Sequence, residues 1–151
     1  MDDSSYGEIL HVDDDPLVLE ALRLPLLADG YAVTVATSAA EALGHVSAGL
    51  VPDVMIVDFN LGDDTDGSQL ILQVRHHLHH CPPVILLTAN PEDAEMPWIT
   101  DAPIWLARKP MPTELLLACL PGLVQVARAT RQAACRTAAR VAGSSMPAWL
   151  S

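Results

Sequence analysis

The sequence contains one lysine, few aromatic residues and no long apolar run. Its aromatic residues are one phenylalanine, two tyrosines and three tryptophans in a chain of 151 residues. Half of the residues are hydrophobic, yet no run approaches the roughly 18 apolar residues that a membrane-spanning helix needs. The N-terminal segment is acidic, where a secretory signal would be basic and then apolar. We therefore predict a cytoplasmic protein without a membrane partner.

Cysteine is also scarce, and its spacing does not indicate a metal or redox motif. The three cysteines, Cys81, Cys119 and Cys135, are odd in number and form no CxxC pair. We expect them to be reduced, small apolar residues. A chain of this length can bury a sufficient core as one domain without disulfides or a structural metal.

Basic residues are few in the body of the chain, which limits the classes of partner. The net charge is −11, and residues 1–112 hold 18 acidic against four basic side chains. Nucleic-acid binding depends on neutralising phosphates, so we expect no direct nucleic-acid partner. A body this acidic is better suited to binding a cation.

The local patterns predict that strands and helices alternate five times. Proline is expected to kink or shorten the first helix at Pro25, to break a short helix at Pro97, and to break or kink the last helix at Pro121-Gly122. Such alternation is typical of an α/β fold, a doubly wound five-stranded parallel sheet with helices on both faces. The predicted strands are 8–12, 31–36, 54–57, 83–88 and 104–107, and the predicted helices are 16–28, 38–48, 68–79 and 113 onward.

The central strand carries the first candidate for chemistry. Its four apolar residues, 54–57, run directly into the carboxylate of Asp58. A short, uniformly apolar run is typical of a parallel strand that is covered on both faces. Ligands of open α/β sheets bind at the carboxyl ends of the strands, so Asp58 is placed where a ligand would bind.

Polar residues follow the other predicted strands at the same edge of the sheet. The first strand is followed by Asp13 and Asp14, the fourth ends at Thr88, and the fifth leads to Lys109. Three carboxylates that lie close together require a cation, because like charges raise each other's pKa. Mg²⁺ prefers oxygen ligands and commonly binds one or two carboxylates together with a phosphate oxygen.

This set of residues suits phosphoryl transfer. A carboxylate can act as a nucleophile and form an acyl phosphate, and the transfer needs positioning and charge neutralisation above all. The metal would bind one phosphoryl oxygen, Lys109 a second, and the hydroxyl of Thr88 a third. All seven other basic residues are arginine, so the only compact ammonium lies where a phosphoryl oxygen would be.

At these positions the sequence resembles the receiver domains of response regulators, the family of the chemotaxis response regulator. The matching motifs are VDDD (12–15), VDFNL (57–61), LLTAN (86–90) and RKPM (108–111). The resemblance covers about residues 7–127 and implies the strand order 2-1-3-4-5. We expect residues 128–151 to form an alanine- and arginine-rich helical extension or linker.

The resemblance also implies a role for each residue of the site. Asp58 resembles the phospho-acceptor and a metal ligand, with Asp14 as a direct Mg²⁺ ligand and Asp13 as a ligand through water. The backbone carbonyl of Asn60 would complete the metal shell. Thr88 resembles the switch hydroxyl and Lys109 the phosphate-pairing lysine, followed by Pro110 at a position associated with a cis peptide.

The implied function is that of a receiver and not of an enzyme with a separate substrate. The donor would be the phosphohistidine of a histidine kinase or a histidine phosphotransfer protein. Phosphorylation would then change the binding of a downstream protein target, and a homodimer is left open. The usual switch aromatic is replaced by Leu106, with Trp105 one position earlier on the other side of the strand.

Two other functions are compatible with parts of the pattern. The missing switch aromatic favours a receiver-like scaffold that binds partners without phosphorylation. An aspartate-nucleophile phosphatase of the haloacid-dehalogenase type would need a carboxylate two residues after Asp58, where Asn60 stands. Asp15 is expected to cap a helix, and the loop residues Asp63, Asp64 and Asp66 to contact solvent.

The remaining polar groups are assigned structural roles. His11 lies within the first strand and is expected to be a core residue. The histidines between 76 and 80 are expected to form an exposed helix end, although pairs of them could bind Zn²⁺ or Ni²⁺ adventitiously. The stripe of Arg128, Gln132, Arg136 and Arg140 is expected to lie on a solvated helix.

Overall fold

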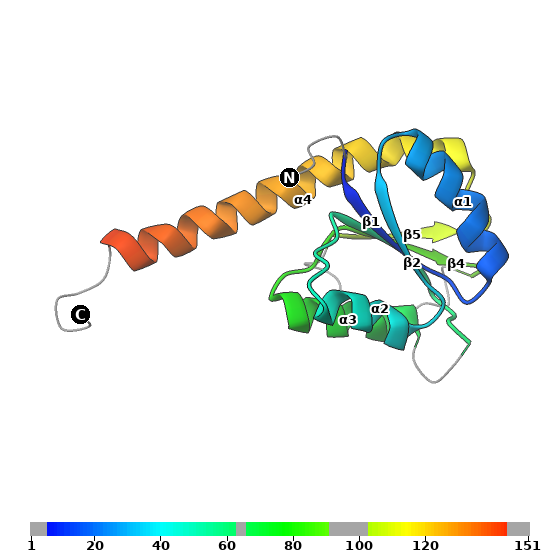
Figure 1. Cartoon of the computed structure of the whole chain (residues 1–151), viewed down its shortest axis with the longest axis horizontal. Helices are drawn as coiled ribbons and strands as arrows, with labels where there is room; N and C mark the ends of the chain where they lie inside the picture. Colours follow the sequence, from blue (N-terminus) through cyan, green and yellow to red (C-terminus); the bar gives the residue numbers. More distant parts are fainter. Residues whose placement is uncertain (1–5, 63–65, 91–102, 145–151) are drawn as a thin grey trace.

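The computed structural model describes residues 6–62, 66–90 and 103–144, which form one twisted parallel sheet with helices on both faces (Figure 1). All neighbouring strands pair in parallel, in the order β2-β1-β3-β4-β5. The predicted fold class and strand order are therefore confirmed. The strands are β1 (Glu8–Val12), β2 (Ala32–Ala36), β3 (Val54–Asp58), β4 (Val84–Thr88) and β5 (Ile104–Arg108).

Burial along the strands follows their hydrophobic patterns. Every residue of β3 and β4 is buried, whereas β2 and β5, the two edge strands, are partly exposed. The histidine of β1, His11, is 1% exposed, which confirms that it is a core residue. On β5, Trp105 is exposed and Leu106 is partly buried, so the two side chains lie on opposite sides of the strand.

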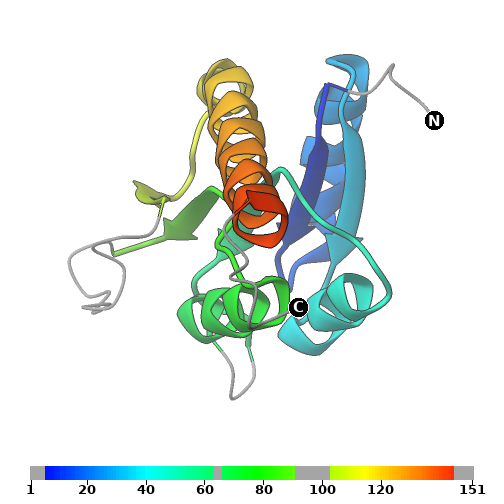
Figure 2. The same cartoon turned by 90° about the vertical axis from the view of Figure 1, so that its left-hand side faces the viewer.

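The helices form two layers, one on each face of the sheet (Figures 1 and 2). Helices α1 (Pro16–Ala28) and α4 (Thr113–Ser144) cover one face, where Leu26 and Leu120 pack with Ile56. Helices α2 (Ala39–Ser47) and α3 (Gly67–Leu78) cover the other face. The central strands are thus buried between two layers of helices, each with its apolar face toward the sheet.

Short polar side chains cap the N-termini of α1, α2 and α3. Asp15 accepts the N–H of Leu17 at the start of α1, as predicted, and Ser38 accepts the N–H of Glu41 in α2. Asp66 forms a reciprocal capping box with Gln69 at the start of α3. Its expected role as a solvated loop residue is therefore wrong, because Asp66 satisfies backbone donors that would otherwise lack partners.

Neither of two prolines that were expected to kink or interrupt a helix ends it. Pro25 lies inside α1, which continues to Ala28 and does not end early. Pro121 lies inside α4 and does not break it. The helix extends from the sheet well past the rest of the molecule (Figure 1). The broken helix that was expected around Pro97 lies outside the described residues.

Ion pairs join α4, around residues 128–131, to the residue that precedes β3. Asp53, which directly precedes β3, is 3% exposed and receives the N–H of Glu8 on its Oδ2 at 2.8 Å. The guanidinium of Arg128 lies 3.6 Å from the same oxygen, and that of Arg131 pairs with Oδ1. Arg128, which was predicted to belong to a solvated stripe, and the nearby Arg131 therefore contact a buried carboxylate. No helix among the described residues is long and apolar enough to span a bilayer.

Candidate functional site

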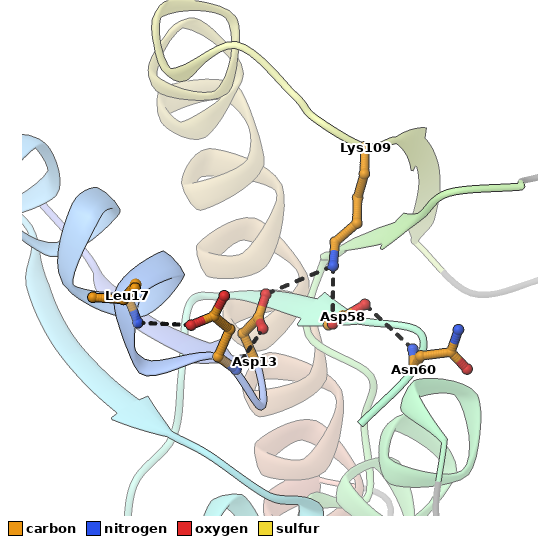
Figure 3. Close-up of polar contacts among 6 residues, drawn as sticks. Asp13, Leu17, Asp58, Asn60 and Lys109 are labelled. Carbon is orange, nitrogen blue, oxygen red and sulfur yellow. Dashed lines mark hydrogen bonds and ion pairs between the residues drawn. The ribbon is translucent and has the colours of Figure 1, made fainter. Parts of the chain in front are cut away.

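The carboxylates of Asp13, Asp14 and Asp58 meet at the carboxyl edge of the sheet, where the central strands end. Figure 3 shows two of them, Asp13 and Asp58. Asp58 is the last residue of β3 and Asp13 directly follows β1; both are buried, and Asp14 next to them is exposed. One carboxylate oxygen from each residue lies within 4.8 Å of the others. The juxtaposition that was predicted from the strand ends is present.

Lys109 brings a cation to the same place from the end of β5. Its Nζ lies 3.0 Å from Oδ2 of Asp58 and 3.9 Å from Oδ2 of Asp13 (Figure 3). The peptide bond between Lys109 and Pro110 is cis, as the resemblance implied. The ammonium therefore faces the acidic cluster from the side opposite to the loop after β1.

The two charged groups beside Asp58 respond to burial and to each other. Burial raises the pKa of Asp13 most, and the charges of Asp58 and Asp14 raise it further. Burial lowers the pKa of Lys109, but the hydrogen bond to Asp58 and the three negative charges outweigh this effect, so its pKa is raised. Lys109 is thus held as an ammonium, whereas burial and the neighbouring carboxylates make the charged form of Asp13 less favourable than it is in water.

The donor atoms of the cluster fit a hard divalent cation. Asp13 accepts the N–H of Asp15 on Oδ1 at 2.9 Å, but its buried Oδ2 has no hydrogen-bond donor among the described residues. Asp14 and Asp58 add further carboxylate oxygens, and all ligands available here are oxygen atoms. A buried carboxylate oxygen without a hydrogen-bond donor, 3.9 Å from the ammonium of Lys109, suits a divalent cation in an all-oxygen site.

Thr88 and Asn60 lie at the same edge of the sheet as this cluster. Thr88 ends β4, is 7% exposed, and its Oγ1 accepts the N–H of Asn90 at 3.3 Å. The N–H of Asn60 donates to Oδ1 of Asp58 at 3.2 Å, while its side chain is exposed (Figure 3). The backbone after β3 thus turns back toward Asp58, next to the position predicted for its carbonyl as a ligand.

The sequence analysis missed Gly67, which supports the backbone at Asp58. Its N–H donates to the carbonyl oxygen of Phe59 at 2.7 Å. A Cβ atom at this position would lie 2.6 Å from the carbonyl oxygen of Asp58 and 3.0 Å from Leu86. Its place directly after the helix cap Asp66 was a signal for a tight turn, but not for this distant contact.

The histidines at the end of α3 do not form a second preformed metal site. His76, His77 and His79 are exposed. Within the described part of the chain, only the three aspartates bring three histidine, cysteine or carboxylate ligands within 4.8 Å of one another. Among the described residues, this cluster of metal-ligand groups lies at the carboxyl edge of the sheet.

Comparison with known proteins points to one family. Residues 9–117 match the family model described as the response regulator receiver domain. The transcriptional regulatory protein GlrR of Escherichia coli is 40% identical over 84 residues, which cover 56% of this chain and 18% of that protein. The transcriptional regulatory protein KdpE of Mycobacterium tuberculosis is 36% identical over 94 residues, 62% of this chain and 40% of that protein. The match thus spans less than half of either relative.

Solved structures show the same architecture. The N-terminal domain of a response regulator/sensory box/GGDEF three-domain protein from Carboxydothermus hydrogenoformans superposes with a TM-score of 0.71 at 27% identity. It covers 82% of this chain and 98% of that one. A receiver domain protein from Methanospirillum hungatei has a TM-score of 0.69 at 23% identity and shares the fold.

Proposed function

Because this chain belongs to the response regulator receiver family of two-component systems, we propose that Asp58 accepts a phosphoryl group from a phosphohistidine. The donor is a histidine kinase or a histidine phosphotransfer protein, and phosphorylation changes the binding of a downstream protein. The receiver unit comprises residues 7–127. The observation that carries the proposal is the buried Asp58 carboxylate, with the ammonium of Lys109 at 3.0 Å and two further carboxylates beside it.

The transfer follows from the chemistry of the groups in the site. A carboxylate oxygen of Asp58 attacks the phosphorus, an O–P bond forms, and the N–P bond of the donor breaks. The electrons of the N–P bond stay on that ring nitrogen. The donor leaves as a neutral imidazole because its other ring nitrogen carries a proton. Lys109 then pairs with an oxygen of the phosphoryl group, and the hydroxyl of Thr88 donates to another.

A Mg²⁺ ion would be held by the side chains of Asp13, Asp14 and Asp58 and by the carbonyl of Asn60. When bound, it supplies positive charge that offsets the charge of the carboxylates and of the incoming phosphoryl group. The unpartnered Oδ2 of Asp13 supports this assignment. In time, water attacks the phosphorus, releases inorganic phosphate and restores the carboxylate of Asp58, so no separate substrate is turned over.

The proposal is tested by intact-mass measurement after incubation with Mg²⁺ and acetyl phosphate. We expect one added phosphoryl group on the wild-type chain and none on Asp58→Asn. Asp66→Asn is the control, because Asp66 is outside the acidic cluster and caps α3. An unmodified wild-type chain, or equal modification of Asp58→Asn, would contradict the proposal.

One observation favours a second function, a scaffold that binds proteins without being phosphorylated. Leu106 occupies the place of the switch aromatic, and the neighbouring Trp105 is 47% exposed on the other side of β5. If the chain is such a scaffold, the wild type and Asp58→Asn will bind the partner protein with equal affinity, with or without acetyl phosphate. If it is a receiver switch, the affinity of the wild type for the partner must differ between the samples with and without acetyl phosphate.

A further inference from the structure

A cavity lies at the amino edge of the sheet, opposite to the edge that carries Asp58. It has a volume of about 520 Å³ and is open to solvent. Its floor includes the prolines that precede β3, β4 and β5, and its walls are the end of α3 and the part of α4 around Arg131. In Figure 1 this edge faces left, where α3 ends and α4 passes beyond the sheet.

Four of the side chains that line this cavity are basic. Arg75 and His79 come from α3, His80 follows it, and Arg131 comes from α4. No carboxylate lines the cavity within the described part of the chain, although the whole protein carries a net charge of −11. Such a concentration of basic groups in an acidic protein attracts an anion.

The two arginines of the cavity differ in what they already bind. Arg131 pairs with the buried carboxylate of Asp53, which fixes its guanidinium at the wall. Arg75 forms no ion pair with a carboxylate of the described residues and is partly exposed. Its planar donor group is available for a carboxylate, sulfonate or phosphate.

The rest of the cavity is apolar and includes an aromatic ring. Trp105 of β5 is 47% exposed and Val126 of α4 is 44% exposed, and both line the cavity. An exposed tryptophan beside basic groups can cover the flat face of a ligand while the charges bind its polar end. The volume is within the range of small-molecule sites.

We propose that this cavity binds a small organic anion that carries a planar apolar group. Arg75 and the histidines after it bind the anionic group, and Trp105 with Val126 packs against the planar part. The site is separate from the phosphoryl site, because the two lie at opposite edges of the sheet. A bound ligand would also join the end of α3 to α4, since residues of both helices line the cavity.

The test uses 1-anilinonaphthalene-8-sulfonate, a sulfonate on fused rings, added to the folded full-length chain. We expect saturable fluorescence enhancement that weakens with added salt. Arg75→Gln should raise the dissociation constant about three- to tenfold, the range for losing one partly exposed charge-assisted contact. Arg23→Gln is the matched control, because Arg23 lies on α1 outside the cavity and pairs with Glu20.

A second measurement locates the probe on the wild-type chain, independently of any substitution. In ¹H–¹⁵N correlation spectra, the largest shifts should be those of the Trp105 indole and of the amides of residues 75–81. The competing site is the mostly apolar cavity of about 440 Å³ between α1 and Met111, next to Lys109. Shifts confined to that cavity, no binding, or equal affinity of Arg75→Gln and wild type would overturn the proposal.

Discussion

At the residue scale, the closest constraint on the phosphoryl site is the absence of a side chain at Gly67. The carbonyl oxygen of Asp58 and the side chains of Val57 and Leu86 occupy the space that a Cβ atom would need. The α3 helix can therefore begin directly against the end of β3. Any larger residue must move the backbone of Asp58 or the start of α3.

Gly67→Ala is expected to destabilise the fold by about 1–3 kcal/mol, because the added methyl group overpacks a filled space. It should also slow phosphorylation of Asp58 by acetyl phosphate. Gly44→Ala is the matched control: Gly44 lies inside α2 with no atom near its would-be Cβ. It should stabilise the protein by about 0.5–1 kcal/mol. Urea denaturation measures both, and equal stability of the two variants would contradict this account.

The sequence predicted which side chains meet at the site, but not what supports them. Asp13, Asp58 and Lys109 were placed together because the carboxyl ends of parallel strands share one edge. Their proposed roles remain predictions. Gly67 and Asp66 were missed because their contacts depend on the path of the loop between β3 and α3, which composition does not determine.

At the scale of elements, α4 shows where local propensity is overridden by packing. Proline inside a helix costs about 3 kcal/mol, which led to the prediction of a break or kink at Pro121-Gly122. The buried leucines Leu116 and Leu120 and the buried Val124 lie on either side of it and pack against the sheet. Burying each such side chain contributes about 1.5–3 kcal/mol, so their sum exceeds the cost of the proline. The break was wrong for this reason.

The pairing of α4 with Asp53 was not predictable from the sequence, because the partners are separated by 78 residues along the chain. We expect Asp53→Asn to destabilise the protein by about 1–3 kcal/mol. The amide oxygen can still accept the N–H of Glu8, but Arg128 and Arg131 lose their counter-charge. Both arginines are partly exposed, which keeps the cost below that of a fully buried pair.

Denaturation in urea gives the loss of stability, and hydrogen exchange of the amides of residues 128–133 shows whether α4 is released. Glu20→Gln removes the exposed pair with Arg23 and is the control. It should change stability by less than about 0.5 kcal/mol. Unchanged exchange in Asp53→Asn would show that packing alone holds this part of α4.

At the scale of the whole molecule, the acidic cluster links metal binding to folding. The three carboxylates come together only when β1 and β3 are paired, so the unfolded chain has no such site. Mg²⁺ should therefore raise the free energy of unfolding, by about 2.7 kcal/mol at 100 times its dissociation constant. Asp14→Asn should weaken this effect, and it should not lower stability without Mg²⁺ because it relieves repulsion.

Urea denaturation with Mg²⁺ and with a chelator measures this linkage for wild type and Asp14→Asn. Asp29→Asn is a control carboxylate, because Asp29 caps the end of α1, outside the cluster. Its response to Mg²⁺ should equal that of the wild type. Identical midpoints with and without Mg²⁺ in the wild-type chain would exclude a metal site that forms on folding.

The continuity of α4 gives the molecule a lever arm. Residues 128–144 extend it by about 25 Å at 1.5 Å per residue. A tilt of α4 by about 10° at its contact with Asp53 would move the outer end of the helix by about 4 Å, because the same helix contains both points. A small repacking between α4 and the sheet would thereby become a larger displacement at the outer end of the helix.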